Sequence, residues 1–294
     1  MKNRLIVLSI TIMTLIFALS AYAQEAAEAD APLIDPARIP ISYLSEDGRL
    51  IHPWIVNPLD TTHNADAPLL VGEEMQFKIH YGKIRAGTAY IKVKGIMDTD
   101  FGRAYLIETR AESAKAINAF FKVRDINYSW IGVDDLSSYG YSQSIREGNY
   151  VRDEWISLDA AKKIFYGRHK KKGDPNIITG ITTGSVQDML SSLFYVRTQD
   201  INTTDELVFD VANREKTYPL VMKIIGKEKV SVPAGDFNCI IVEPFFRGEG
   251  IFSQKGKRIL VWLTDDEKRI PIRMEAEVFI GSVKVSLEKY IVNK

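Results

Sequence analysis

From Val71 onward, apolar and polar side chains alternate at every second residue, and this pattern limits the fold more than any other feature of the chain. One such segment, MQFKIHY, alternates Met75, Phe77, Ile79 and Tyr81 with Gln76, Lys78 and His80. Another, RDINYSWI, alternates Ile126, Tyr128 and Trp130 with Asp125, Asn127 and Ser129. Strict alternation is typical of half-buried strands in antiparallel sheets, and we expect the apolar members to point inward.

The same pattern recurs near the C-terminus in IPIRMEAEV and VKVSLEK, and turn segments such as YGKIRAG, VPAGD and TDDEKR separate the strands. We therefore predict a mainly β protein with an antiparallel meander of about ten to twelve strands. Because a long sheet with two open edges would aggregate, we expect it to form a curved sheet or a barrel.

One segment, TGSVQDMLSSLFYVR, has helical spacing instead. Val186, Leu190 and Leu193 recur at this spacing, which predicts an amphipathic helix over about residues 185–197. Ser185 is the predicted N-cap, and Asp188 follows three residues later as in a capping box. A second, weaker helical turn is predicted in SAKAINAFF, residues 113–121.

The N-terminus has the three parts of a secretory signal peptide. Lys2 and Arg4 precede an apolar run over residues 5–19, and the small residues Ala21 and Ala23 follow. This predicts a signal peptide over 1–23, cleavage between Ala23 and Gln24, and a periplasmic location. A transmembrane anchor is the alternative, but the run is short for a bilayer. With no cysteine at the cleavage point and no later apolar run of spanning length, we expect neither a lipid-modified N-terminus nor a transmembrane anchor after cleavage.

Residues 24–70 hold six of the eleven prolines and predict an extended N-terminal segment before a single β domain over 71–294. HPWIVNPL could dock on that domain through Trp54 and Ile55, or the segment could be a flexible spacer. Removal of the signal peptide would leave 36 basic against 38 acidic residues. That balance argues against nucleic-acid binding, and the run Lys170 to Lys172 is typical of a solvated loop.

Several motifs occur in an order that resembles one family. They are VGEEMQFKIHYGKIRAGTAYIKV, KVRDINYSWI, DMLSSLFYVR, VPAGDFNCIIVEP and VWLTDDEKRIPIRMEAEVFIGSVKVSL. Together they resemble the bacterial exported proteins of domain of unknown function 3108 over about residues 71–294. The resemblance implies an antiparallel β-rich periplasmic domain with no established catalytic residues. A looser likeness in architecture is to periplasmic lipoprotein carriers, whose curved sheets hold acyl chains under helices.

The only cysteine, Cys239, lies in VPAGDFNCIIVEP. Pro233 suits the second position of a type I turn and Gly235 the left-handed position after it, so a hairpin is predicted here. Apolar residues on both faces of the strand predict that Cys239 packs as a small hydrophobe. A reactive thiolate would need nearby cationic groups, which the flanking sequence does not supply.

Other signs of catalysis are weak. Ser185 lacks the glycine pattern of a nucleophile elbow, and the histidines His52, His63, His80 and His169 are scattered, so we expect neither a metal site nor a cofactor. Asp125, beside Arg124 in an aromatic strand, is expected to form a structural ion pair. Paired carboxylates such as Asp134 and Asp135 point to opposite faces of a strand and make no dyad alone.

These observations favour a non-enzymatic envelope protein that binds an apolar or amphipathic ligand, such as a lipid, or an envelope protein partner. The candidate ligand-binding residues are inward-facing aromatics, namely Phe77, Tyr81, Tyr128 and Trp130. Core packing explains the same residues equally well. Two alternatives remain open, a scaffold or protein-interaction module of the envelope and, less favoured, a glycan or cell-wall hydrolase.

Overall fold

The computed structural model of the protein describes residues 43–44, 48–171, 173, 175–213, 216–246, 258–277 and 281–293. The expected signal peptide over 1–23, its cleavage between Ala23 and Gln24, and the N-terminal segment up to residue 42 lie outside these ranges. Within the ranges, no helix combines the length and the apolar character that crossing a membrane requires.

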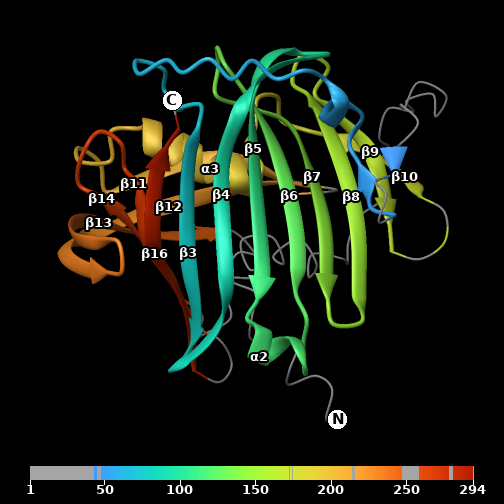
Figure 1. The fold of residues 1–294 in the computed structure, drawn as a ribbon. Coiled ribbons are helices and arrows are strands. Elements are labelled where there is room, and N and C mark those ends of the chain that lie inside the picture. The colour runs from blue at the N-terminus through green and yellow to red at the C-terminus, as the bar shows by residue number, and fades with distance from the viewer. Residues whose placement is uncertain are drawn as a thin grey trace.

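One antiparallel sheet of 14 strands dominates the fold (Figure 1). Its strands are β3 (Glu73–Tyr81), β4 (Ile84–Thr99), β5 (Gly102–Ser113), β6 (Arg124–Gly132), β7 (Ser138–Glu147), β8 (Tyr150–Asp159), β9 (Ile164–Lys170), β10 (Asn176–Ile181), β11 (Glu206–Asn213), β12 (Lys216–Val232), β13 (Gly235–Phe246), β14 (Ile259–Thr264), β15 (Pro271–Glu277) and β16 (Ser282–Val292). The other elements are β1 (Tyr43–Leu44), β2 (Leu50–Ile51), the 3-10 turn η3 (Pro53–Val56), and the helices α2 (Lys115–Asn118) and α3 (Met189–Thr198).

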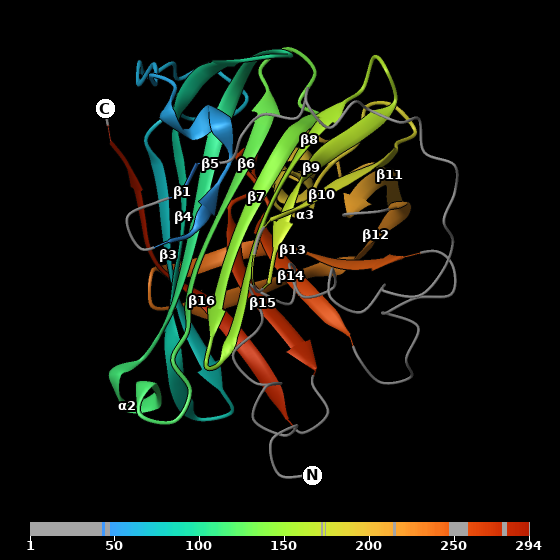
Figure 2. The same cartoon turned by 90° about the vertical axis from the view of Figure 1, so that its right-hand side faces the viewer.

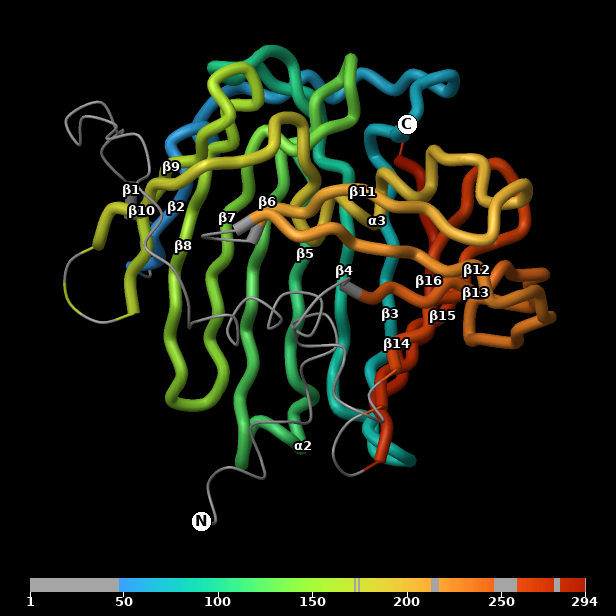
Figure 3. The backbone as a smooth tube through the Cα atoms, turned by 180° about the vertical axis from the view of Figure 1, so that it is seen from behind, coloured from blue at the N-terminus to red at the C-terminus, as the bar shows by residue number. Residues whose placement is uncertain are grey.

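The order of strands across the sheet divides it into two halves. Strands β3 to β10 follow each other in sequence on one half, and β16 pairs with β3 to begin the other half, which runs back to β11. The second half folds over the first, so that β11, β12 and β13 run across the upright strands β4–β8 (Figure 3). We call the side of β3–β10 that faces α3 and β11–β16 the inner face, and the opposite side the outer face.

The expected ten to twelve strands are too few, and the sheet does not close as a barrel by strand pairing. The undercount has a physical cause, because β7 and β8 are buried on both faces over most of their length and show no alternation. The segment before α3 connects the two halves of the sheet. Ser138 N–H, at the start of β7, donates to the Val186 carbonyl at 2.9 Å, and Gln187 N–H donates to the Asp210 carbonyl of the edge strand β11 at 2.8 Å.

This bridging segment also corrects the predicted start of the helix. Because Val186 and Gln187 are extended, α3 begins at Met189, and its N-cap is Asp188 rather than Ser185, which is exposed. The Asp188 carboxylate accepts hydrogen bonds from Leu190 N–H at 2.7 Å and Ser191 N–H at 3.0 Å. The predicted helical turn in residues 113–121 is present as α2.

The main core lies between the two halves of the sheet and includes one side of α3. It combines apolar residues of β3 and β5 with others from α3 and from the second half, among them Phe77, Ile107, Leu190, Phe194, Val242, Ile272 and Val285. Arg197, near the end of α3, fixes the helix to β3 through the buried carboxylate of Glu73. The two guanidinium distances are 2.8 and 2.6 Å, and Tyr290 donates to the same carboxylate at 3.0 Å.

Residues 48–60, which we call the N-terminal strap, lie against the outer face. Trp54 is buried there and Ile55 is half-buried. HPWIVNPL therefore docks on the sheet through these two residues and is not a flexible spacer. Leu50 packs on Trp155 of β8, and Asp60 forms a bridge with Ile96 of β4.

Pro233 and Ala234 form the turn of the β12–β13 hairpin, in which Val232 pairs with Gly235. Gly235 has a φ of +135°, in the region that favours glycine, so the predicted hairpin is present with glycine where the turn needs it.

We expect Arg197→Met to lower the free energy of unfolding by about 3–5 kcal/mol, because it leaves the Glu73 carboxylate buried and without its cation. Arg258→Met is the matched control. It breaks an ion pair with Glu243 in which Arg258 is 53% exposed, and should cost at most about 1 kcal/mol. Urea unfolding monitored by circular dichroism measures both, and equal losses would contradict the role given to the buried pair.

Candidate functional site

Polar side chains form a row across the inner face, where apolar side chains would be expected. Cross-strand partners in register share a face of the sheet. The register pairs Thr109 of β5 with Asn127, Asn127 with Gln143, Gln143 with Glu154, Glu154 with His169, and His169 with Asn176. Thr109, Asn127, Gln143 and Glu154 are all at least 96% buried.

Three buried ionisable residues flank this row, and with it they form what we call the inner polar band. The band comprises Thr109, Asp125, Asn127, Gln143, Glu147, Arg152, Glu154 and His169. All eight belong to β5–β9, the strands that form one half of the sheet. The neighbouring row toward α3 is mostly apolar, running from Ile107 through Ser129, Tyr141 and Ile156.

Hydrogen bonds within the band account for part of its polarity. Asn127 Nδ2 donates to Thr109 Oγ1 at 3.2 Å, and Arg152 Nη2 donates to Gln143 Oε1 at 2.6 Å. Glu154 accepts from Tyr141 at 3.1 Å and lies 3.3 Å from His169 Nδ1. The band therefore contains hydrogen-bonded pairs rather than only isolated polar residues.

Asn127 Oδ1 is a buried oxygen atom of the band that has no hydrogen-bond donor among the residues that the structure describes. The Asp125 carboxyl group, in contrast, is hydrogen-bonded to that of Glu147. A buried polar atom without a partner costs about 1–3 kcal/mol, so native proteins keep few of them. Asn127 Oδ1 marks the place where the band could accept a hydrogen bond from a ligand.

Asp125 carries the most unusual charge state in the band. Burial, together with the nearby Glu147 carboxylate, raises the pKa of its carboxyl group to about 7, although the hydrogen bond from Arg146 N–H acts to lower it. The two carboxyl groups therefore share a proton near neutral pH, and this part of the band carries less negative charge than its residues suggest.

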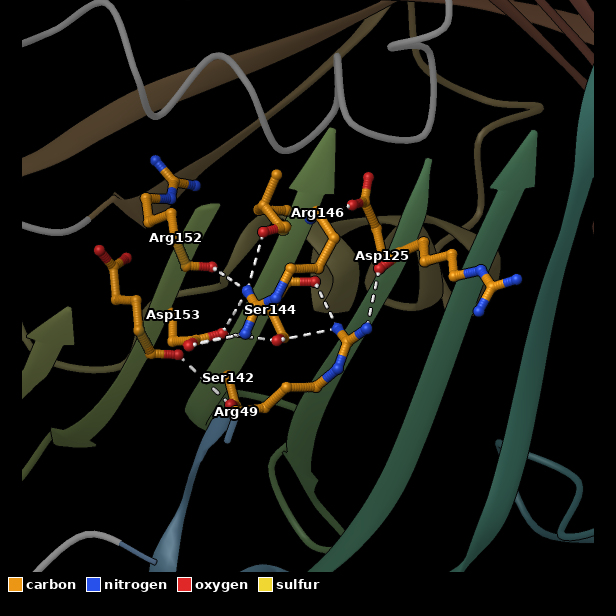
Figure 4. A network of polar contacts seen from close by, with 10 residues as sticks. Arg49, Asp125, Ser142, Ser144, Arg146, Arg152 and Asp153 are labelled. Atoms are coloured by element: carbon orange, nitrogen blue, oxygen red, sulfur yellow. Dashed lines mark hydrogen bonds and ion pairs between the residues drawn. The ribbon is translucent and has the colours of Figure 1, made fainter. Parts of the chain in front are cut away.

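The expected ion pair between Asp125 and Arg124 does not form in the described residues. Arg146 N–H donates to Asp125 Oδ1 at 2.8 Å, while the Arg146 guanidinium pairs with Asp153 on the outer face at 2.8 and 2.9 Å. Arg49 of the N-terminal strap donates to Ser144 Oγ at 3.0 Å (Figure 4). Ser144 in turn donates to Asp153 at 2.6 Å, so this network connects the strap to Asp125 through β7.

The strap also places a histidine among tryptophans on the outer face. The ring centroid of His52 lies 4.4 Å from that of Trp54, 4.5 Å from Trp130 and 4.8 Å from Trp155. Its Nδ1 accepts from Trp54 N–H at 3.1 Å, and its Nε2 lies 2.9 Å from Ser157 Oγ. Burial lowers the pKa of His52 to about 3, so the ring is neutral and acts as an aromatic anchor of the strap.

The four aromatic residues proposed from the sequence as ligand-binding do not share one surface. Phe77 is buried in the main core and Tyr81 packs against it, whereas Trp130 and Tyr128 belong to the outer-face cluster around Trp54. The expected inward orientation of Ile126, Tyr128 and Trp130 is thus wrong, because the register puts Asp125, Asn127 and Ser129 on the inner face. The strap covers the aromatic side instead.

Sequence reasoning did not identify the inner polar band, although one signal was present. In RDINYSWI the polar members Asp125, Asn127 and Ser129 alternate as regularly as the aromatic ones. The aromatic face of this strand is buried by the N-terminal strap, which packs on it through Trp54. Alternation alone gives the period of the strand and does not say which set faces the larger core.

Cys239 is 99% buried in the main core, and burial raises the pKa of its thiol to about 11. This agrees with packing rather than reactivity. Among the described residues, no group of three or more histidine, cysteine, aspartate or glutamate side chains is placed to hold a metal ion.

Comparisons with known proteins identify the family. The chain belongs to the family described as protein of unknown function DUF3108, whose model matches residues 76–288. No curated protein matches it in sequence.

Comparison with solved structures found three matches that cover most of the chain. A β-barrel-like protein of domain of unknown function DUF1849 from Brucella abortus has a TM-score of 0.51 and 9% identity, covering 76% of this chain and 98% of that chain. A proposed exported protein with a YmcC-like fold from Bacteroides fragilis has a TM-score of 0.33 and 10% identity, covering 75% and 95%. A proposed lipoprotein from Parabacteroides distasonis has a TM-score of 0.31 and 11% identity, covering 79% and 97%. At such identities the first of these likenesses shows the fold alone.

The raised pKa of Asp125 predicts a pH-dependent stability. Between its ordinary pKa of 3.8 and about 7, the folded protein keeps a proton that the unfolded chain has lost. The free energy of unfolding should therefore fall as pH rises through this window, by up to about 1.4 kcal/mol per pH unit, and level off above it. Asp125→Asn should reduce this slope and raise stability at pH 8, whereas Asp236→Asn, on an exposed part of β13, should leave both unchanged. Urea unfolding at pH 4 to 8 measures this, and an unaltered slope in Asp125→Asn would refute the assignment.

Cys239→Ala should lower the free energy of unfolding by about 1–2 kcal/mol through the small cavity it leaves. The native thiol should react with a disulfide reagent only after denaturation, because burial keeps it protonated and inaccessible. Rapid labelling of the folded protein would show that Cys239 is accessible and reactive.

Proposed function

Starting from its membership of the DUF3108 family, we propose that this protein is a non-enzymatic component of the bacterial envelope that binds an amphipathic ligand on the inner face of its sheet. The inner polar band would receive the polar group of the ligand, and the neighbouring apolar surface would receive its hydrocarbon part. An exported location is supported by the signal-peptide pattern of residues 1–23.

The change of character along one row of the sheet supports an amphipathic ligand over a purely apolar one. The polar row ends at Thr109 on β5, whose partner on β4 is Ile91, and Ile91 in turn pairs with Met75 on β3. Ile91 and Met75 are both at least 97% buried. A molecule lying along this row would meet hydrogen-bonding groups at one end and apolar side chains at the other.

The chemistry of the band favours a polar group that donates hydrogen bonds. Asn127 Oδ1 is a buried acceptor that no described residue serves. Since Asp125 and Glu147 share a proton near neutral pH, a hydroxyl or amide donor suits them better than an anion. The single observation that carries the proposal is therefore the buried row of polar side chains on an inner face that is otherwise apolar.

A glycan hydrolase is the competing function, because Asp125 and Glu147 are two neighbouring carboxyl groups, and one of them is protonated near neutral pH. Both are more than 90% buried, on strands whose other buried residues pack the interior. A polymeric substrate would have to pass through the packed interior to reach this pair, so their burial argues against a glycan hydrolase.

Native mass spectrometry of protein purified from the periplasm tests the proposal. The wild-type protein should carry a co-purifying small molecule with a hydrocarbon chain. Combined Asn127→Leu and Gln143→Leu should lower its affinity roughly thirtyfold, at about 1 kcal/mol for each lost hydrogen bond. Asn127→Leu removes an unpaired buried oxygen, but Gln143→Leu removes an acceptor of the buried Arg152 guanidinium, so the double variant should lose stability, and circular dichroism must show that it is folded before affinities are compared.

Asn238→Leu, which changes an exposed asparagine on β13, is the matched control and should keep the ligand. A wild-type protein that carries no small molecule would favour the scaffold alternative. If the double variant carried as much ligand as the wild type, the ligand would not bind at the inner polar band.

A further inference from the structure

One end of the first half of the sheet combines exposed apolar side chains with exposed cations. Because β3–β10 form an antiparallel meander, the connections after β3, β5, β7 and β9 all lie at the same end. We call it the α2 end, since α2 lies in the connection after β5 and projects from it (Figures 1 and 2).

Large apolar side chains at the α2 end are exposed to an unusual degree. Phe120, directly after α2, is 85% exposed, and Ile84, at the start of β4, is 58% exposed. Tyr150 and Val151, at the start of β8, are 39% and 43% exposed. They come from three separate connections, so the strand order and not the local sequence brings them together. Scattered single apolar residues need no explanation, but a group gathered at one end does.

Basic residues accompany these apolar side chains. The exposed cations at the α2 end are Lys83, Arg85, Lys115, Lys122, Arg124 and Lys171. Among the described residues of β3–β10 at this end, Glu112 is the exposed acidic residue. Asp125, Glu147 and Asp153 also lie at this end, but their side chains are buried.

The opposite end of the same strands is less basic. Asp98 at the end of β4, Asp100 in the connection after β4, and Asp134 and Asp135 in the connection after β6 are exposed there. Three exposed cations, Arg103, Lys162 and Lys163, lie at the same end and offset most of this charge. The excess of exposed cations is therefore confined to the α2 end, although the chain as a whole has equal numbers of basic and acidic residues.

We propose that the α2 end docks onto an anionic lipid surface. Exposed aromatic and aliphatic side chains surrounded by lysine and arginine suit the boundary between lipid head groups and acyl chains. The opposite end would point away from the surface. This inference does not depend on the ligand, although the inner polar band lies within about four residues of the α2 end on β5 to β9 and so would lie near the lipid.

Co-sedimentation with vesicles tests the inference. The full mature protein should bind vesicles made of equal amounts of phosphatidylglycerol and phosphatidylcholine, and should bind pure phosphatidylcholine much less. Added salt should weaken the binding because it screens the charges.

Two variants at the α2 end should weaken binding without altering the fold. Combined Lys115→Gln and Lys122→Gln should lower the partition coefficient about twenty-five-fold, at roughly fivefold for each charge. Phe120→Ala should lower it roughly tenfold through the lost apolar burial. The matched controls lie at the opposite end and should bind as the wild type does. They are Lys162→Gln with Lys163→Gln for charge, and Val56→Ala for an apolar side chain that is 61% exposed.

Equal binding to both kinds of vesicle, or wild-type binding by Phe120→Ala, would overturn the inference. A concentration-dependent dimer in light scattering that Phe120→Ala dissociates would also overturn it, because the surface would then serve a second copy of this chain. The proposal that the inner polar band binds a ligand is tested independently of the docking proposal. Protein that carries no small molecule but still binds anionic vesicles supports docking alone, and substitutions in the inner polar band should leave vesicle binding unchanged.

Discussion

The inner face of β3–β10 is largely apolar and has to be covered, and that requirement shapes the whole molecule. The cover consists of α3 and the second half of the sheet, and the N-terminal strap covers part of the outer face as well. Each covering element is fixed by polar contacts as well as apolar ones. Glu73 and Arg197 fix α3, and Arg49, Ser144 and Asp153 fix the strap.

The sequence predicted the class of fold well because alternation is a local signal. It identified the antiparallel sheet, the helix near residue 190 and the hairpin at Pro233 and Gly235. It undercounted the strands, because β7 and β8 are buried on both faces, and it placed the helix start at Ser185 instead of Asp188. Both errors arise where a distant segment, such as the Val186–Gln187 bridge, decides the local structure.

The candidate site shows the same limit more clearly. The aromatic members of RDINYSWI look like the natural core residues, and Trp130 is indeed completely buried. It is buried by His52 and Trp54, far away in sequence, which leaves Asn127 and Asp125 to face the interior. No single strand reveals the row from Thr109 to His169, because it exists only once five strands are in register. Periodicity therefore identified the strands but not the site they form.

The docking of the strap has a consequence for the order of events as the chain folds. The strap contacts come early in the chain, yet His52 needs Ser157, which follows 105 residues later, and Glu73 needs Arg197, which follows after 124. Contacts so distant in sequence form slowly, because the intervening chain must first be brought into place. Because the strap is made before β8, it cannot complete its docking until β8 has joined the sheet. During that interval the aromatic rings of the undocked strap, His52 and Trp54, stay exposed, and a chaperone that holds exposed aromatic segments would find its target there.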